Sequence, residues 1–385
     1  MIKKNSRFFL SFLFLFSIFF SLVLLELAVR IGSDQASYYH GQYPKNLIDS
    51  KSPSNLKPNF NGNFPTSEIK GNIRINSKGL RDYERTYLKK VDFRILGLGD
   101  SFTFGHGVEF NESFLTKLEL LLKLKFGESK IEIIKSGSPG FSIKHYFNFL
   151  RKEGYKYDPD MTVLFFFIGN DTHINAKLSK NPTKSELNSS GNFFWSVKSF
   201  LRENSHLYSY VVAILKTNIK IASSLYKLGL ATGLYEFRQI EILRKNHSEQ
   251  YEIEWQKTFE YLNKIKSLSK NLLLILLPSR EQVNSDRLRN ALTQLDYDKK
   301  QIDIYSPNRK LIDFLNKEEI KYLDLLNGFI SSYQKNNESL FFVIDPHYNV
   351  AGHKFVAKRV YSYLEAKLVR KFSKKTILNS KRQNR

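Results

Sequence analysis

The chain has 385 residues and contains no cysteine. This absence excludes disulfide bridges, thiolate metal sites and cysteine nucleophiles. It does not indicate a compartment, because an oxidising space is harmless to a chain without thiols. Acidic residues are also scarce, since 37 Asp and Glu stand against 60 Lys and Arg, for a formal charge of +23. Such an excess suits an anionic partner, but it suits a Lys-rich background composition equally well, so charge alone assigns no function.

The overall composition is that of a globular protein, with 42% hydrophobic and 25% charged residues. These values exclude a collagen-like or wholly disordered chain. The basic residues are scattered and no nucleic-acid-binding motif frames them, so we expect no nucleic-acid partner. The histidines, including His106 and His353, lack the spacing of metal ligands, and we expect neither a metal nor a cofactor.

An apolar run lies close to the N-terminus. Residues 8–25 carry no charge, and the apolar character continues past a single acid. The run has the length of a membrane-spanning helix and exceeds the apolar core of a signal peptide. Because Lys3, Lys4 and Arg7 precede it, the positive-inside rule predicts a cytoplasmic N-terminus and an extracytoplasmic remainder. A cleaved signal peptide is the alternative; we expect residues 1–30 to be a retained single-pass anchor in the inner (cytoplasmic) membrane, which places the main domain in the periplasm.

The rest of the chain divides by its pattern. Residues 31–91 are rich in Asn, Ser, Pro and Gly and contain a strand-like piece at 71–75, which predicts a stalk with a small hairpin. Over 92–370, almost wholly apolar strands alternate with helices, as in a parallel sheet covered on both faces. The predicted fold is therefore α/β, three layers αβα, with a central mainly parallel sheet. Expected strands occupy 93–101, 130–137, 160–171, 271–279 and 321–326, and expected helices 112–126, 142–154, 254–269, 308–316 and 349–369.

Two segments interrupt or follow this alternation. Residues 172–248 form a predicted helical insertion, with helices near 193–202, 207–226 and 235–244. The insertion could be a lid or a solubilising or dimerising subdomain, and the pattern does not separate these. Residues 371–385 are basic without one acid, which is typical of a solvated tail.

Two segments with reactive side chains follow the first two predicted strands. Ser101 stands in Gly-Asp-Ser where a strand gives way to a helix, so it can be an exposed nucleophile with its own N–H unpaired. An ordinary helix cap is the alternative for a serine in this place. After the second strand, Gly140 lets the backbone approach a ligand and offer an N–H, although a simple turn would also explain it.

Two further segments complete a possible site. Asn170 follows the third strand and can direct its amide at a developing oxyanion; a helix cap is the alternative. Near the C-terminus, Asp345 precedes His347 by two residues and can hold one ring nitrogen while the other acts as a base. We expect His353, on the following helix, to be structural. Arg280 follows a strand end and is a candidate substrate contact, with a surface ion pair as the alternative.

These segments supply, in chain order, a nucleophile, two oxyanion donors and an Asp–His base. The set resembles the SGNH (GDSL-like) hydrolase superfamily, whose four blocks contribute Ser, Gly, Asn and His. The G-D-S of the first block matches 99–101, the glycine of the second falls on Gly140, the asparagine of the third on Asn170 in a G-N-D that lacks one intervening residue, and the closing histidine on His347. The resemblance covers about 92–368 apart from the insertion.

The last block departs from the usual pattern, since the acid stands two residues before the histidine instead of three. Similar D-x-H spacing occurs in membrane-anchored relatives, including alginate acetyltransferase-like proteins, so we take it as a mark of that subgroup. Position 136 is Ser where Asn is common, which weakens the support of the second block only.

The resemblance implies a serine esterase. Ser101 would attack an ester carbonyl, His347 would take its proton, and Asp345 would orient the ring. The oxyanion would be held by the N–H groups of Ser101 and Gly140 and by the amide of Asn170. An extracytoplasmic enzyme of this type is expected to remove acyl groups, such as acetyl, from an envelope or extracellular carbohydrate.

Three alternatives stay open at this point. An O-acetyltransferase would use the same site with a sugar hydroxyl in place of water. A lipase-like activity would suit a domain tethered beside a bilayer. A catalytically idle, membrane-anchored scaffold that binds polysaccharide would need none of the four residues. The sequence does not predict an oligomeric state.

Overall fold

The computed structural model describes most of the chain in two compact units. The first unit groups Met1–Gln42, Pro65–Ser67 and Lys177–Thr232, and the second groups Tyr43–Phe64, Glu68–Ala176 and Gly233–Arg385. The described residues are 2–32, 43–65, 70–172, 197, 200, 201, 204–217, 221, 224, 235–247, 249–295, 297–336, 339–343 and 345–383.

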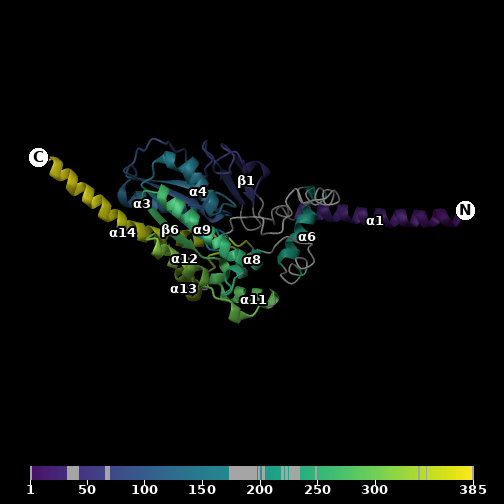
Figure 1. Cartoon of the computed structure of the whole chain (residues 1–385). Helices are drawn as coiled ribbons and strands as arrows, with labels where there is room; N and C mark the ends of the chain where they lie inside the picture. The colour runs from purple at the N-terminus through teal and green to yellow at the C-terminus, as the bar shows by residue number, and fades with distance from the viewer. Residues whose placement is uncertain are drawn as a thin grey trace. The chain divides into compact units, whose positions relative to one another are not determined.

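The second unit is built on a five-stranded sheet (Figure 1) in the order β4-β3-β5-β6-β7. All neighbouring strands run parallel. Numbered within this sheet the order is 2-1-3-4-5, the flavodoxin-like order, in which ligands bind where the strand order reverses. The predicted parallel α/β fold is confirmed. The strands are β3 (Phe93–Gly99), β4 (Ile131–Gly137), β5 (Met161–Phe167), β6 (Leu272–Leu277) and β7 (Lys321–Asp324).

Alternate residues of each strand enter two separate cores, which makes the unit three-layered. On β3, Ile95 belongs to a core shared with α3, α13 and α14, whereas Leu96 and Leu98 belong to a core shared with α4, α9 and α12. Strand residues alternate between faces in this way because the side-chain period of a strand is two. The covering helices are α3 (Phe114–Phe126), α4 (Ile143–Lys152), α9 (Glu249–Leu268), α12 (Ser306–Lys317), α13 (Leu326–Asn336) and α14 (Val350–Gln383).

The hairpin predicted from 71–75 is present as a separate two-stranded sheet, β1 (Asn61–Pro65) and β2 (Lys70–Arg74). Its core includes Ile73, Ile75 and Phe104, the last residue of the short helix α2 (Ser101–Phe104). Buried Arg81 ties the same parts together, because one guanidinium nitrogen donates to the Gly105 carbonyl at 2.7 Å and the other to that of Val108 at 2.9 Å. The hairpin is therefore fixed to the segment that follows β3.

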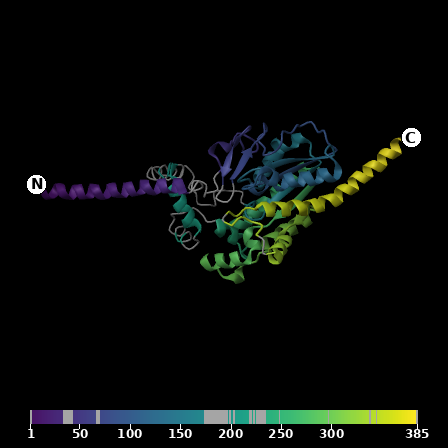
Figure 2. The same ribbon diagram turned by 180° about the vertical axis from the view of Figure 1, so that it is seen from behind.

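The C-terminal helix is longer than predicted. It extends from Val350 to Gln383, through most of the segment 371–385 that we expected to be a tail; Figure 2 shows it from behind. No Gly or Pro follows Gly352, so nothing in the local sequence terminates the helix. Elements absent from our predictions are α10 (Arg280–Val283), α11 (Ser285–Leu295), α13 and the 3-10 helices η2 (Lys45–Leu47), η3 (Phe110–Glu112), η4 (Gly154–Tyr157) and η6 (Lys299–Gln301).

The first unit contains the predicted apolar helix, α1 (Ile2–Gly32), in which Phe9–Gly32 is long and apolar enough to cross a membrane. It also contains α6 (His206–Thr217), from the middle of the predicted insertion. The last predicted helix of the insertion corresponds to α8 (Tyr235–Ile242), which belongs to the second unit. Residues 173–196 and much of 218–234 lie outside the described residues.

Candidate active site

Ser101 stands at the start of α2, directly after β3. The Asp100 side chain caps this helix and accepts a hydrogen bond from the Phe102 N–H at 2.9 Å. At the end of the neighbouring strand, a Cβ on Gly137 would lie 2.1 Å from the Phe104 nitrogen. Only glycine leaves room there for α2 to pack on β4. The sequence thus folds locally into a strand, a tight turn and a short helix that hold Ser101 at the carboxyl edge of the sheet.

The three residues predicted as a catalytic triad lie in one hydrogen-bonded chain. Ser101 Oγ is 2.7 Å from His347 Nε2, although 246 positions separate the two residues. His347 Nδ1 is 2.6 Å from Asp345 Oδ1, and the same oxygen accepts the His347 backbone N–H at 2.9 Å. The D-x-H spacing lets one carboxylate oxygen hold both the backbone and the ring of the histidine, which fixes the ring orientation.

The protonation states of Asp345 and His347 depend on their burial and on the charges of their neighbours. Burial raises the pKa of Asp345, but His347 and His106 outweigh it, and the pKa lies well below its ordinary value. Burial and the neighbouring His106 lower the pKa of His347 from 6.5, against the opposing effect of Asp345. At neutral pH the pair is therefore a carboxylate and a neutral imidazole, the protonation states that a general base needs.

Two residues that our sequence analysis did not select extend the chain on its far side. His106 Nε2 is 3.2 Å from the second oxygen of Asp345, and His106 Nδ1 is 2.6 Å from the hydroxyl of Tyr43. The rings of His106 and His347 lie 4.1 Å apart between centroids. His106 is five positions after Ser101, in the loop that follows α2, and this proximity was the one available signal.

The hydrogen bonds define the tautomer of a neutral His106. An ionised carboxylate only accepts hydrogen bonds, so His106 Nε2 carries the proton toward Asp345. Nδ1 is then an acceptor, and Tyr43 is its donor. Burial raises the pKa of Tyr43 well above its ordinary value, so the phenol keeps its proton. Asp345 therefore receives ring N–H groups from two histidines.

The same three side chains are the described residues that could hold a metal ion, since ligand atoms of His106, Asp345 and His347 lie within 4.8 Å of one another. A cation there would need the lone pairs of both rings. One of those rings already contacts Ser101 and the other Tyr43, so the observed arrangement is that of a hydrogen-bonded chain.

The predicted oxyanion donors have different surroundings. The Asn170 side chain forms a hydrogen bond with Asp100, the residue before Ser101, which brings its amide to the turn that carries Ser101. Gly140 is exposed, has a φ of 74°, and has nothing within 4 Å of the position of a Cβ. The carboxyl ends of β3, β4 and β5 thus carry the three groups, as predicted, at the edge where the strand order reverses.

Two buried carboxyl groups support this edge. Burial raises the pKa of Asp100 to about 7 and also raises that of Asp171, which lies close enough for the two charges to repel. Asp171 accepts hydrogen bonds from the Tyr146 hydroxyl and the Phe167 N–H, both at 2.7 Å. These hydrogen bonds of Asp171 hold the turn after β5 that carries Asn170.

Arg280 and His353 are both buried behind the site. Arg280 Nη1 donates to the backbone carbonyl of Asp345 at 3.3 Å, so this side chain supports the loop of the acid; a contact with substrate stays a prediction. His353 Nδ1 accepts the Phe114 N–H at 3.2 Å, and burial lowers its pKa to about 3. Its hydrogen bond between α14 and α3 is that of a structural residue.

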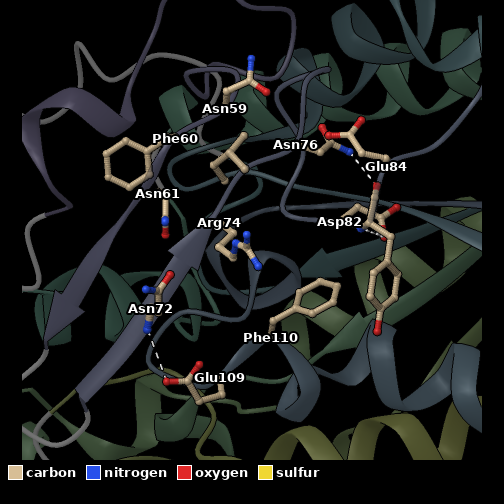
Figure 3. A pocket seen from close by; sticks show the side chains of 12 residues that line it. Asn59, Phe60, Asn61, Asn72, Arg74, Asn76, Asp82, Glu84, Glu109 and Phe110 are labelled. Atoms are coloured by element: carbon tan, nitrogen blue, oxygen red, sulfur yellow. Dashed lines mark hydrogen bonds between the residues drawn. The ribbon is translucent and has the colours of Figure 1, made fainter.

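A cavity of about 520 Å³ lies beside the hairpin. Figure 3 shows the guanidinium of Arg74 in the middle of this cavity, with Phe110 on one side and the asparagines of the hairpin on the other. The ring of Tyr83 meets that of Phe110 edge to face, 5.0 Å apart between centroids. Amide groups, aromatic rings, the Arg74 guanidinium and three carboxyl groups, those of Asp82, Glu84 and Glu109, therefore line the same space. The hydrogen bonds of Arg81 connect it to the segment after Ser101.

No family model matches the sequence, and no curated protein matches it. Solved structures that it resembles include an acetyl xylan esterase, at 14% identity over 70% of this chain and 99% of that one, with a TM-score of 0.39. Others are a catalytic mutant of an acetylxylan esterase from Geobacillus stearothermophilus (14%, 70% and 93%, TM-score 0.39) and a member of the lipolytic protein G-D-S-L family from Veillonella parvula (12%, 70% and 97%, TM-score 0.36). At such low similarity, a function must be argued from the site itself.

Proposed function

We propose that this protein is a membrane-tethered serine esterase that removes acetyl or other short acyl groups from a carbohydrate. The observation that carries the proposal is the chain Ser101–His347–Asp345, with contacts of 2.7 and 2.6 Å. A serine hydroxyl paired with a neutral imidazole, itself held by a carboxylate, is the arrangement that activates serine as a nucleophile.

In the first half of the reaction, Ser101 Oγ attacks the ester carbonyl and its proton moves to His347 Nε2. Asp345 stabilises the imidazolium that forms. The C–O bond to the sugar then breaks, and the imidazolium gives its proton to the leaving sugar oxygen. The product is an acyl ester on Ser101 and a free sugar hydroxyl, so atoms and charge balance.

In the second half, water attacks the acyl ester with His347 again as the base, and Ser101 is released with the acid product. The negative charge of both tetrahedral intermediates needs preorganised donors. We assign this role to the N–H groups of Ser101 and Gly140 and to the amide of Asn170. The hydrogen bond from Asn170 to Asp100 supports the assignment, because it holds that amide at the nucleophile turn.

The cavity around Arg74 supports a carbohydrate as the alcohol part of the ester. Sugars bind through hydrogen bonds to amide and guanidinium groups and through apolar contact with aromatic rings, and Asn72, Arg74 and Tyr83 offer these groups together. Since Arg81 joins this wall to the loop after Ser101, a polymer could occupy both places.

The location that we propose is the periplasmic face of the inner membrane. The helix Phe9–Gly32 supports a membrane anchor. Lys3, Lys4 and Arg7 before the helix support a cytoplasmic N-terminus.

The first test is covalent labelling of the full-length protein in detergent with a fluorophosphonate probe, followed by peptide mass mapping. We expect the label on Ser101, and none in the Ser101→Ala or His347→Ala variants. Ser142→Ala is the matched control, because the Ser142 hydroxyl also contacts a histidine, His145, at 3.1 Å, but within a helix cap. Absence of label on a folded protein would favour the idle scaffold over the esterase.

A second measurement defines the reaction. Acetate release from p-nitrophenyl acetate and from O-acetylated xylan is compared with release from a long-chain p-nitrophenyl ester. Preference for the acetyl esters supports the proposal, whereas preference for the long chain would indicate a lipase. If added oligosaccharide captures the acetyl group in place of water, the protein is an O-acetyltransferase that uses the same site.

A further inference from the structure

Glu26 is the only acid in the apolar part of α1, and it makes four hydrogen bonds there. Its carboxylate accepts from Arg30 Nε at 2.8 Å and from Ser205 Oγ at 2.7 Å. It also accepts the backbone N–H groups of His206 at 2.8 Å and Leu207 at 2.9 Å. A carboxylate near the edge of a bilayer is costly unless it is paired. Every one of these partners lowers that cost.

The contact is also a helix cap. The first N–H groups of a helix have no partner within it, and an acidic oxygen is their favoured acceptor. α6 begins at His206, so Glu26 of one helix caps the other. Arg30 adds a further hydrogen bond between the same two segments, since its Nη2 donates to the Asn204 carbonyl at 2.6 Å. The insertion is thereby fastened to α1 by charged and polar contacts within one unit.

The position of Glu26 along α1 determines how deep in the bilayer its contact with α6 lies. A hydrocarbon core of about 30 Å takes roughly 20 helical residues. Counted from Phe9, the start of the apolar span, such a core ends close to Glu26, at the side opposite the N-terminus. Figure 1 shows α6 crossing this end of α1 instead of continuing along it. A helix held across the end of a spanning helix lies along the membrane surface.

The composition of α6 suits that place. Its sequence HLYSYVVAILKT is apolar with two tyrosines, a residue type enriched at membrane interfaces. Val211 on α6 is 44% exposed, and Phe200, in the helical residues before it, is 64% exposed. Large apolar side chains in contact with water are unfavourable, but in contact with acyl chains they are not.

We propose that α6, with the helical residues before it, lies in the interface of the bilayer that α1 spans, and that Val211 and Phe200 contact lipid. This inference rests on the proposed anchor and gives the insertion a role that the sequence left open. Its partner is a lipid surface. The hydrogen bonds of Glu26 hold α6 against α1. They therefore determine how the insertion is oriented at the membrane surface.

The absence of cysteine makes the test direct. Single-cysteine variants Val211→Cys, Leu22→Cys and Asn263→Cys of the full chain are spin-labelled in vesicles of phosphatidylethanolamine and phosphatidylglycerol. Leu22 lies within the span, and exposed Asn263 lies on α9 of the other unit. Oxygen dissolves in the bilayer, whereas a water-soluble nickel reagent stays outside it. We expect the labels at 211 and 22 to be accessible to oxygen and protected from the nickel reagent. The label at 263 should be accessible to the nickel reagent instead.

Three results would overturn the inference. A label at 211 that is as open to the nickel reagent as at 263 would place α6 in water, and one protected from both reagents would place it against protein, such as a second copy. A label at 22 open to water would remove the anchor itself and the inference with it. Acetate release by the same variants is measured in parallel, so a failed anchor and a failed esterase are told apart.

The cap is tested by Glu26→Leu in the Val211→Cys background. Leucine keeps α1 apolar but removes the acceptor, so the label at 211 is expected to become open to the nickel reagent while a label at 22 stays in lipid. Glu26→Gln keeps an acceptor oxygen and is expected to fall between the two. An unchanged label at 211 in Glu26→Leu would show that the cap does not hold α6 at the membrane.

Discussion

His347 shares its carboxylate with a second histidine, and this has a measurable consequence. Burial and His106 both lower the pKa of His347 from 6.5, while Asp345 raises it. Since the base must be neutral, we expect kcat/KM for p-nitrophenyl acetate to be half-maximal below pH 6.5 on its acid side. In His106→Phe the N–H donor to Asp345 is lost, so the carboxylate stabilises the imidazolium of His347 more strongly. The midpoint should therefore move up by roughly one pH unit, the equivalent of one hydrogen bond.

The conservative variant separates this positioning role from a merely structural one. His106→Gln keeps an N–H group that can reach Asp345, so its midpoint should lie closer to that of the parent protein. Tyr43→Phe removes the donor that fixes the tautomer of His106 and should give an intermediate shift. If the midpoint of all three variants equals that of the parent protein at unchanged thermal stability, His106 does not act on the base.

Asn170 gives a second prediction for a single residue. If its amide holds the oxyanion, Asn170→Ala should lower kcat by roughly 100- to 1,000-fold, as the loss of one such donor does elsewhere. The nucleophile itself should stay active, because Ser101 keeps its contact with His347. Labelling by the fluorophosphonate should thus continue at a reduced rate. A variant with normal turnover would remove Asn170 from the mechanism.

The packing of α2 on β4 leads to a prediction about two glycines. A Cβ on Gly137 would lie 2.1 Å from the Phe104 nitrogen, whereas a Cβ on Gly140 has open space around it. Gly137→Ala must therefore displace the helix that carries Ser101, and we expect most activity and several degrees of Tm to be lost. In Gly140→Ala the strain of a φ of 74° is the main cost, about 1 kcal/mol, so the fold should persist. Equal thermal stability of the two variants would contradict this account.

His353, which links α14 to α3, makes the free energy of unfolding depend on pH. Its folded pKa is about 3, below the usual 6.5. Between these values the unfolded chain binds a proton that the folded chain does not, so stability is fully present above pH 6.5 and falls as the pH drops toward 3. The slope from this group is at most about 1.4 kcal/mol per pH unit.

Urea unfolding of the full chain in detergent, at pH 7, 6, 5 and 4, checks this slope. His353→Gln can still accept the Phe114 N–H and has no proton to gain. Its unfolding free energy should therefore depend less on pH than that of the parent protein. Identical slopes would show that His353 is not the titrating group.

The sequence predicted the elements with strong patterns and missed those without one. All five strands of the main sheet were foreseen, because the apolar runs of β5 and β6 are almost unbroken and the other strands alternate with helical patterns, and so was the hairpin. Helices α11 and α13 and the continuation of α14 to Gln383 were missed. The sequence of α11 is mostly polar, α13 begins only two residues after the end of β7, and no Gly or Pro after Gly352 marks an end of α14. Ser101, Asp345 and His347 were selected from their place in four segments that resemble a known family, and the structure brings the three side chains into one hydrogen-bonded chain. Tyr43 and His106 were missed. His106 had only its closeness to Ser101 in the sequence as a signal, and Tyr43 had none, since only the folded chain brings them to the second oxygen of Asp345.

At the scale of the whole molecule, the esterase that we propose uses two parts of the described chain, the sheet edge that carries Ser101 and the cavity beside the hairpin. This predicts different effects on large and small substrates. A polymer that occupies the cavity beside the hairpin gains contacts with Arg74 and Tyr83, whereas a small ester needs only Ser101 and its neighbours. We therefore expect Arg74→Ala to raise KM for O-acetylated xylan several-fold and to change kcat/KM for p-nitrophenyl acetate by less than about twofold.

The control for the lost charge is Lys264→Ala, at an exposed position on α9, which should leave both substrates unaffected. Tyr83→Ala should repeat the effect of Arg74→Ala on the polymer, because the ring of Tyr83 forms part of the same wall. Since hydrolysis of the polymer and of the small ester uses the same proposed nucleophile, only a loss confined to the polymer identifies the cavity as a sugar site. Equal losses on both substrates would mean that Arg74 supports the fold of the hairpin, and no loss on either would leave the polymer bound by other residues around Ser101.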